Sequence, residues 1–213
     1  MMLLSQFPSF FRAKPQYLPF KAPQKMSFNT AVFEEFPLLS TPRLQLRDIR
    51  AQDAEAIFAM RANGRVNQFI ARPSMQELAG AQALVERTRN AYAQGAAIGW
   101  AGVLRDGHTI IGTCGFNSIE QQNQHAEIGG EMATEYWGKG IAQEAVQAIL
   151  RFGITTMGLH TIEAKVNPNN RGAIHVLESL GFQKEAHFKE RIQFEGKFWD
   201  MAVYTLLRGD FAG

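Results

Sequence analysis

Cysteine and long apolar runs are both scarce in this sequence. Cys114 is the one cysteine in 213 residues, so neither an internal disulfide bond nor a cysteine-rich metal site can form. No stretch approaches the roughly 18 uncharged apolar residues that a membrane-spanning helix needs. Because such cysteine usage is typical of a reducing compartment, we expect a cytoplasmic protein. The 46% of hydrophobic residues is ordinary for a folded protein, and the length suits one sizeable domain.

Acidic residues are missing from the first 33 positions. The segment carries Arg12, Lys14, Lys21 and Lys25, whereas the first acidic residue is Glu34. The net charge of +2 therefore resides in this segment, and the remaining chain is slightly acidic. That balance, without a basic stripe, argues against a nucleic-acid partner.

Residues 1–36 are expected to form an N-terminal tail, and residues 37–213 a single domain. Prolines interrupt the apolar residues of the tail and the charges follow them, which is unlike a secretory signal. Three interpretations stay open. The tail is flexible or an over-extended start with Met26 as the first residue, it packs on the body or a second subunit, or it is a targeting segment.

Hydrophobic periodicity predicts alternating strands and helices in the body. The expected strands span 43–49, 97–104, 109–116, 126–132 and 161–166, with two more flanking Glu195-Gly196; the expected helices span 53–63, 74–94, 140–157 and 170–180. Ser74 with Glu77 reads as a capping box, Asp106-Gly107 as a hairpin turn, and Gly129-Gly130 as a bulge or a close backbone approach. Hairpins mixed with one crossover predict a mixed sheet in one α+β domain.

A glycine-punctuated turn at residues 137–143 links a strand to the longest helix. The first amides of a helix lack internal acceptors and carry the positive end of its dipole, so this turn can bind an anion. Neither nucleotide-binding motif fits, because Lys139 is followed by Gly140 rather than Ser or Thr, and Gln143 stands where a third glycine is required. A plain tight turn is the alternative.

Two motifs decide between these interpretations. Trp-Gly-Lys-Gly-Ile-Ala at 137–142, followed by Val-Asn-Pro-Asn-Asn-Arg-Gly-Ala-Ile-His-Val-Leu-Glu-Ser-Leu-Gly-Phe at 166–182, resembles the GCN5-related N-acetyltransferase (GNAT) family. Residues 38–47 and 126–129 are similar to its RimJ/RimL-like branch of ribosomal-protein N-terminal acetyltransferases. The resemblance runs from about residue 38 to residue 208. It implies one mixed, mostly antiparallel sheet with splayed central strands, flanked by helices.

The resemblance also implies acetyl-CoA as co-substrate, with no metal. Backbone amides of residues 138–143 would hold the pyrophosphate, and the pantetheine arm would lie along residues 131–133. The cofactor-binding residues implied in this way are Met132, Ala133, Trp137, Gly138, Lys139, Gly140, Ile141, Ala142, Gln143 and Asn170. Lys139 has a second interpretation as a solvated charge near the phosphates.

Catalytic candidates lie on the strand at 126–132. Glu127 and Glu131 share one face of it, with His125 at its start, and a carboxylate there is unusual unless it is functional or paired. Glu127 matches the position where the family often places its proton acceptor, and a structural ion pair is the alternative. Ala173 replaces the serine with which the branch usually assists the departing thiolate, so the general acid is unassigned. Cys114 is expected to be buried and inert.

The chemistry favours one class of acceptor. A thioester is attacked by a neutral amine, and a peptide α-amine, with a pKa of about 7.7–8.0, is far more often neutral than a lysine near 10.4. We therefore expect acetyl transfer to a protein N-terminal α-amine. The alternatives are a small amine, such as a polyamine, amino sugar or amino-acid derivative, and a non-catalytic CoA-binding module. Acidic residues in the acceptor groove would favour a polyamine. A homodimer is consistent with the branch.

Overall fold

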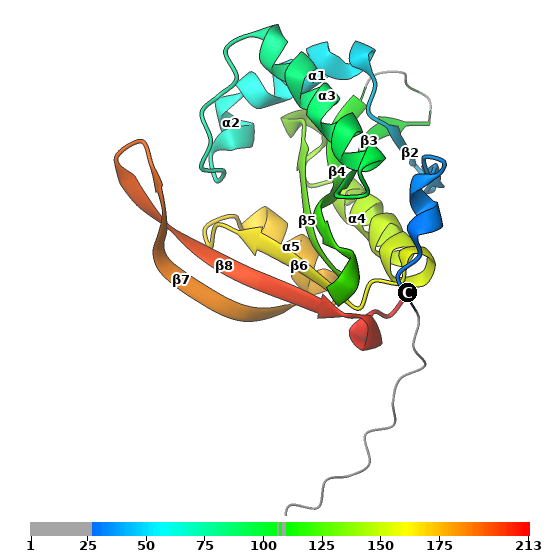
Figure 1. Ribbon diagram of the computed structural model, residues 1–213. Coiled ribbons are helices and arrows are strands. Elements are labelled where there is room, and N and C mark those ends of the chain that lie inside the picture. Colours follow the sequence, from blue (N-terminus) through cyan, green and yellow to red (C-terminus); the bar gives the residue numbers. More distant parts are fainter. Residues whose placement is uncertain (1–26, 106, 108–109) are drawn as a thin grey trace, which may run out of the picture.

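The fold is an eight-stranded sheet with helices on both faces (Figure 1). The computed structural model describes residues 27–105, 107 and 110–213. The strands are β1 (Leu39–Ser40), β2 (Leu44–Asp48), β3 (Ile98–Leu104), β4 (Ile110–Glu120), β5 (His125–Met132), β6 (Thr161–Val166), β7 (Gln183–Phe194) and β8 (Lys197–Leu207). The helices are α1 (Ala54–Ala62), α2 (Gly64–Asn67), α3 (Leu78–Ala93), α4 (Ile141–Phe152) and α5 (Arg171–Ser179).

The strand order β1-β2-β3-β4-β5-β6-β8-β7 contains one parallel pair, β5 with β6, and every other neighbour is antiparallel. The parallel pair is short, since residues 125–127 of β5 align with residues 161–163 of β6 and pairing then stops. β5 continues along β4 to the Gly112–Met132 pair. The predicted α+β class with splayed central strands is therefore confirmed.

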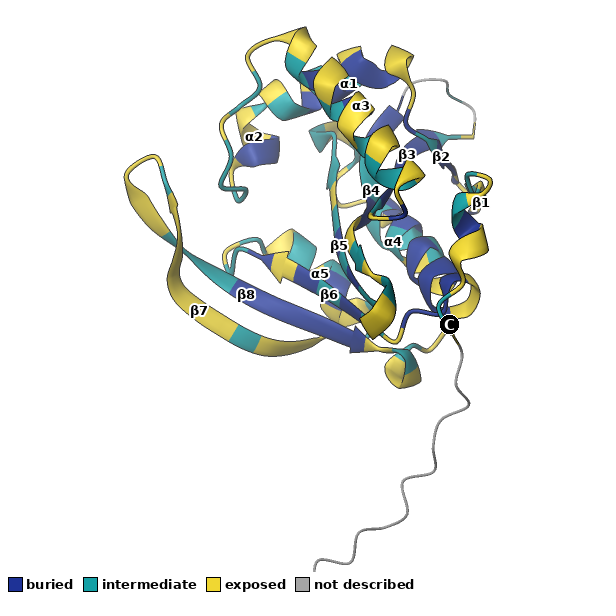
Figure 2. Cartoon of the chain, viewed as in Figure 1, coloured by how far each residue is buried: buried dark blue, intermediate teal, exposed yellow. Residues whose placement is uncertain are grey.

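The two faces of the sheet carry separate apolar clusters because side chains alternate along each strand (Figure 2). Trp100 packs in the cluster that includes α4, whereas its neighbour Ala101 packs with α1 and α3. On α4, Ile141, Ala145 and Ile149 are buried at a spacing of four residues, which turns one stripe of the helix toward the sheet. The helix continues as a π-helical turn, 153–157, and ends at Gly158 with φ +81°.

The predicted capping box at Ser74 is wrong. α3 begins at Leu78 with Glu77 as its N-cap, and the Ser74 hydroxyl instead accepts a hydrogen bond from the Asn67 side chain at 3.1 Å. The Ser74 hydroxyl therefore makes a tertiary contact with Asn67 and does not cap the helix.

The glycine pair in β5 marks a close approach, and the bulge lies on the neighbouring strand. A Cβ on Gly130 would come within 2.7 Å of the Thr113 carbonyl oxygen. The register of β4 against β5 shifts between Phe116 and Ser118, so Asn117 is the extra residue. The expected hairpin turn at Asp106-Gly107 lies partly outside the described residues, because Asp106 is not among them.

Residues 27–36, which the sequence analysis assigns to the tail, pack against the body. The Phe36 ring lies 4.9 Å from the Tyr92 ring and 5.9 Å from the Trp100 ring, measured between centroids. The indole of Trp100 donates a hydrogen bond to the Pro37 carbonyl at 2.8 Å. Within the described part of the chain, no helix has the length and apolarity to cross a membrane.

Candidate active site

The glycine loop ahead of α4 presents an uncapped helix N-terminus. Gly138 and Gly140 have φ values of +70° and +71°, a left-handed conformation that favours glycine. Among the described residues, no side chain caps α4, and the first hydrogen bond of the helix runs from Glu144 N–H to the Gly140 carbonyl. The preceding amides, at 141–143, are thus available to an external acceptor. This geometry suits an anion.

Arg43 holds the loop in place. Its guanidinium donates to the Lys139 carbonyl at 2.7 Å and to a Glu144 carboxylate oxygen at 2.6 Å. Thr41 and the Arg43 backbone N–H donate to the other Glu144 oxygen at 2.5 and 2.8 Å. Burial tends to raise the pKa of Glu144, but these hydrogen bonds outweigh it, so the pKa is lowered and the carboxylate stays charged.

The side chains beside the loop are exposed. Trp137 is 37% exposed, and its indole donates to the Met132 carbonyl at 2.8 Å, which joins the loop to the end of β5. The Arg65 guanidinium lies 5.7 Å from the Trp137 ring, so α2 contacts the loop. Lys139 lies over the Tyr136 ring, with Nζ 5.7 Å from its centroid, and is exposed.

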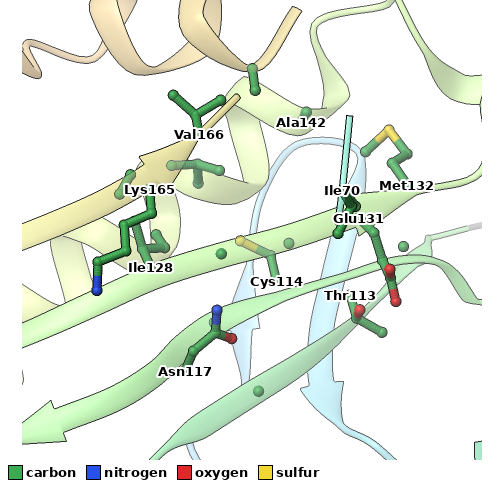
Figure 3. Close-up of a pocket in the computed structure, with 18 of the residues that line it drawn as sticks. Ile70, Thr113, Cys114, Asn117, Ile128, Glu131, Met132, Ala142, Lys165 and Val166 are labelled. Carbon is green, nitrogen blue, oxygen red and sulfur yellow. The ribbon is translucent and has the colours of Figure 1, made fainter. Parts of the chain in front are cut away.

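A cavity of about 560 Å³ passes through the gap between β5 and β6 (Figure 3). Its lining on the α4 and α5 side includes Ala142, Asn170 and Ala173, and on the other side it includes residues of α1, α3 and β8. Asn170 caps α5 by accepting the Ala173 N–H at 3.1 Å, as its motif position implies. The gap therefore joins the glycine loop to the opposite face of the sheet.

Glu127 forms an ion pair. Its carboxylate accepts a hydrogen bond from Lys165 at 2.7 Å, and the same ammonium lies 3.3 Å from Glu163, the neighbour of Glu127 across the strand pair. The hydrogen bond to Glu127 raises the pKa of Lys165. Among the described residues, Lys165 lines the cavity and Glu127 does not. The Glu127 carboxylate therefore contacts a residue of the cavity wall without being part of the wall.

Glu131 is more deeply buried, with 4% of its side chain exposed. One carboxylate oxygen accepts from Arg61 Nε at 2.6 Å, and the other accepts from Arg72 Nη2. Both oxygens are thus already paired with guanidinium groups. His125 lies 3.6 Å from Glu120, at the far end of β5 from Glu131.

Cys114 faces the cavity from β4, opposite Gly130 (Figure 3). Burial raises the pKa of its thiol to about 12, so the thiol is protonated and weakly nucleophilic at neutral pH.

The charged side chains of the site that sequence reasoning missed include Arg43, Arg61, Arg72 and Lys165. Each meets its partner across a long sequence separation, as Arg61 does with Glu131, 70 residues away. The available signal was the buried acidic residue itself, because a carboxylate at Glu131 requires a cationic partner.

The comparisons with known proteins agree with the motifs. A family model described as "Acetyltransferase (GNAT) domain" matches residues 43–183. The "Uncharacterized N-acetyltransferase p20" of Bacillus licheniformis is 34% identical over 175 residues, which cover 82% of this chain and 98% of the relative. The "[Ribosomal protein uS5]-alanine N-acetyltransferase" of Escherichia coli is 28% identical over 178 residues, covering 81% and 92%.

A solved structure shares the fold. RimJ of Mycobacterium smegmatis, in complex with a CoA disulfide, has a TM-score of 0.74 at 23% sequence identity, covering 83% of this chain and 88% of that one.

Proposed function

This chain belongs to the GNAT family of N-acetyltransferases, which use acetyl-CoA, and we propose that its acceptor is the α-amine of a protein N-terminus. The observation that carries the proposal is the cavity through the β5–β6 gap. It joins the anion-binding loop at 138–143 to the opposite face of the sheet. The uS5-alanine acetyltransferase likeness supports the same acceptor class.

The residues fit acetyl-CoA. The uncapped amides at 141–143, with Gly138 and Gly140 keeping the approach open, would bind the pyrophosphate. The pantetheine arm would take the place beside β5 that β6 leaves, along Glu131, Met132 and Ala133. The thioester then lies within the gap, near 128–130, where an amine can reach it from the face of α1 and β8.

Transfer needs one proton acceptor. The neutral amine attacks the thioester carbonyl carbon, the tetrahedral intermediate expels the CoA thiolate, and the amine loses a proton. We assign that proton to Glu127, through water at the cavity wall beside Lys165. Glu131 has both oxygens bound by arginines, so we assign it the role of holding Arg61 and Arg72 in position.

The wall of the cavity disfavours a polyamine. Two arginines and one lysine line it, against the carboxylates of Glu131 and Asp200. A polycationic acceptor would meet like charge at Arg61 and Arg72. We also propose a cytoplasmic location, on the basis of the single cysteine.

The test is thiol release from acetyl-CoA with a panel of peptides, polyamines and amino sugars. Glu127→Gln is expected to lower kcat about a hundredfold, because the proton that the attacking amine loses then has no carboxylate to accept it. Glu163→Gln is the matched control, since it removes the other carboxylate on Lys165, and we expect a change of less than about threefold.

Three results would contradict the proposal. Equal losses in both variants would show that Glu127 matters only as an ion-pair partner. Faster turnover of polyamines than of peptides would move the acceptor to the small-amine class. Binding of acetyl-CoA without turnover of any amine would indicate a non-catalytic module.

A further inference from the structure

The charged side chains that line the cavity form two groups, one beside α1 and the end of β5, the other on β6 and β8. The described residues contribute five of them. They are Arg61, Arg72, Glu131, Lys165 and Asp200. Figure 3 shows Lys165 and Glu131 toward opposite ends of the drawn part of β5.

The side beneath α1 carries excess positive charge. Two arginines share the one carboxylate of Glu131, which leaves one positive charge uncompensated. Each guanidinium has five N–H donors. Among the described residues, neither Nη of Arg61 nor Nη1 of Arg72 has a hydrogen-bond acceptor. About a fifth of each arginine side chain is exposed, and both line the cavity.

Asn67 holds the Arg72 side chain and the Arg61 backbone, and Glu131 holds both guanidinium groups. The buried Asn67 side chain donates to the Arg61 carbonyl at 2.7 Å and accepts from Arg72 Nε at 2.9 Å. The Met75 N–H also donates to the Arg61 carbonyl, at 3.0 Å. The guanidinium groups are thus held in one arrangement before any ligand arrives, which lowers the entropic cost of binding an anion.

Near β6 and β8, the carboxylates of Asp200, Glu127 and Glu163 outnumber the ammonium groups of Lys165 and Lys189. Asp200 accepts from the Glu190 N–H at 2.9 Å and is hydrogen-bonded to His187 at 2.7 Å. The Glu190 N–H and then His187 lower the pKa of Asp200, so it is ionised. Lys165 is outnumbered by its two carboxylate partners, Glu127 and Glu163. An ammonium group is favoured on this side.

We propose that Arg61 and Arg72 bind a carboxylate of the acceptor that lies a few bonds from the attacking amine. The inference rests on the proposed transfer to an amine in the β5–β6 gap. Glu131 lies two residues along β5 from Gly129, which corresponds to about 7 Å. An acceptor whose amine lies near Gly129 could therefore place a carboxylate a few bonds away against the arginines beside Glu131. Arginine N–H pairs match a carboxylate in geometry and charge. An acidic first residue of a peptide and a free α-amino acid both supply this group.

Matched acceptors test the carboxylate directly. One pair is a tetrapeptide amide that begins with Asp and its counterpart that begins with Asn; the other is free alanine and alanine amide. Each pair is compared at equal concentrations of neutral amine. We expect kcat/KM to be about tenfold or more higher for the carboxylate member of at least one pair, and the pair that shows it identifies the source.

Two variants of opposite effect link the preference to this cluster. Arg72→Gln is expected to lower kcat/KM for the carboxylate acceptor about tenfold, with the amide counterpart within about threefold. Glu131→Gln removes the competing negative charge and keeps an amide oxygen that can still accept from an arginine, so we expect the preference for carboxylate acceptors to rise. Arg89→Gln is the control, because it makes the same charge change on the exposed face of α3, with 59% of that side chain exposed.

The outcomes separate this inference from the proposed function. Turnover at equal rates for both members of each pair would overturn the carboxylate site and leave the N-acetyltransferase proposal standing. Equal losses on all acceptors in Glu131→Gln would also overturn it, because Glu131 would then act on the amine itself. No turnover of any amine would contradict both.

Thermal unfolding of each variant checks that the fold is kept. Arg72→Lys keeps the positive charge but lacks the planar fork of N–H donors, so we expect an intermediate loss of kcat/KM for the carboxylate acceptor.

Discussion

At the scale of single residues, two glycines distinguish an effect on stability from an effect on cofactor binding. Gly138 and Gly196 have φ values of +70° and +73°, and no atom lies within 4 Å of a Cβ built on either. Alanine at each position is expected to cost about 1 kcal/mol of unfolding free energy, because the left-handed conformation is strained. Only Gly138→Ala should also raise the KM for acetyl-CoA, by about tenfold, because it narrows the approach to the amides.

Denaturant unfolding and steady-state kinetics on the two variants measure both effects. The loop assignment is contradicted if Gly138→Ala and Gly196→Ala have the same KM for acetyl-CoA as the unsubstituted protein.

Cys114 gives a pH-dependent prediction. Its pKa is about 12 in the folded chain, against 9.0 as the ordinary value, because burial disfavours the thiolate. The unfolded chain therefore releases this proton above pH 9 while the folded chain keeps it, so stability is lost as the pH rises from 9 toward 12. We expect a contribution of about 1.4 kcal/mol per pH unit in that range.

Comparison with Cys114→Ala isolates this contribution, since other titrating groups are shared. The difference in unfolding free energy between the two proteins should shrink by about 2 kcal/mol between pH 9 and pH 10.5. A difference that does not change with pH would show that the thiol ionises alike in both states.

The site residues that could be predicted are those with local signals. Gly140 and Asn170 stand at helix N-termini, where backbone conformation and capping depend on adjacent residues. The arginines around Glu131 could not be predicted in the same way. Their positions depend on how α1 and the segment after α2 pack over β5, which no local pattern encodes.

At the scale of elements, we propose that the separation of β5 from β6 makes room for the thioester. β5 pairs with β6 only over 125–127, so the edge of residues 128–132 that faces β6 has no strand beside it. Acetyl-CoA bound along this edge should slow amide hydrogen exchange in 128–133 and in 138–143. β2, paired on both sides, serves as the internal control.

Hydrogen exchange with mass spectrometry, with and without acetyl-CoA, measures this protection. We expect at least about tenfold slower exchange in the two segments and no change in β2. Protection confined to other segments would place the cofactor elsewhere.

Most elements could be predicted, because apolar spacing is strong in strands and in α4. The start of α3 could not be, since Ser74 carries a valid capping pattern and yet bonds to Asn67. β1 and α2 were also missed, at two and four residues, because they are too short to show a period. A capping pattern in the sequence therefore does not predict a helix start where the capping side chain bonds to another part of the fold.

At the scale of the whole molecule, residues 27–36 join the N-terminal segment to the sheet. Phe36 packs on Tyr92 and Trp100, and Asn29 N–H donates to the Met157 carbonyl at 2.9 Å. We propose that the domain begins near Ser27, ten residues before the boundary expected from the sequence. Composition alone could not locate this boundary, because apolar residues occur on both sides of it.

Two truncations test the boundary. Removal of residues 1–26 is expected to leave the unfolding temperature unchanged, whereas removal of residues 1–36 should lower it by about 5–10 °C, because aromatic contacts with the core are lost. Equal unfolding temperatures for the two truncated proteins would contradict this placement.

We propose that acetyl-CoA and an α-amine meet in the β5–β6 gap. The most direct measurement is mass spectrometric mapping of the product formed from acetyl-CoA and a peptide that carries both a free N-terminus and an internal lysine. We predict one acetyl group, on the N-terminal nitrogen, formed together with one free CoA thiol. Acetylation of the lysine in place of the N-terminus would contradict the claim.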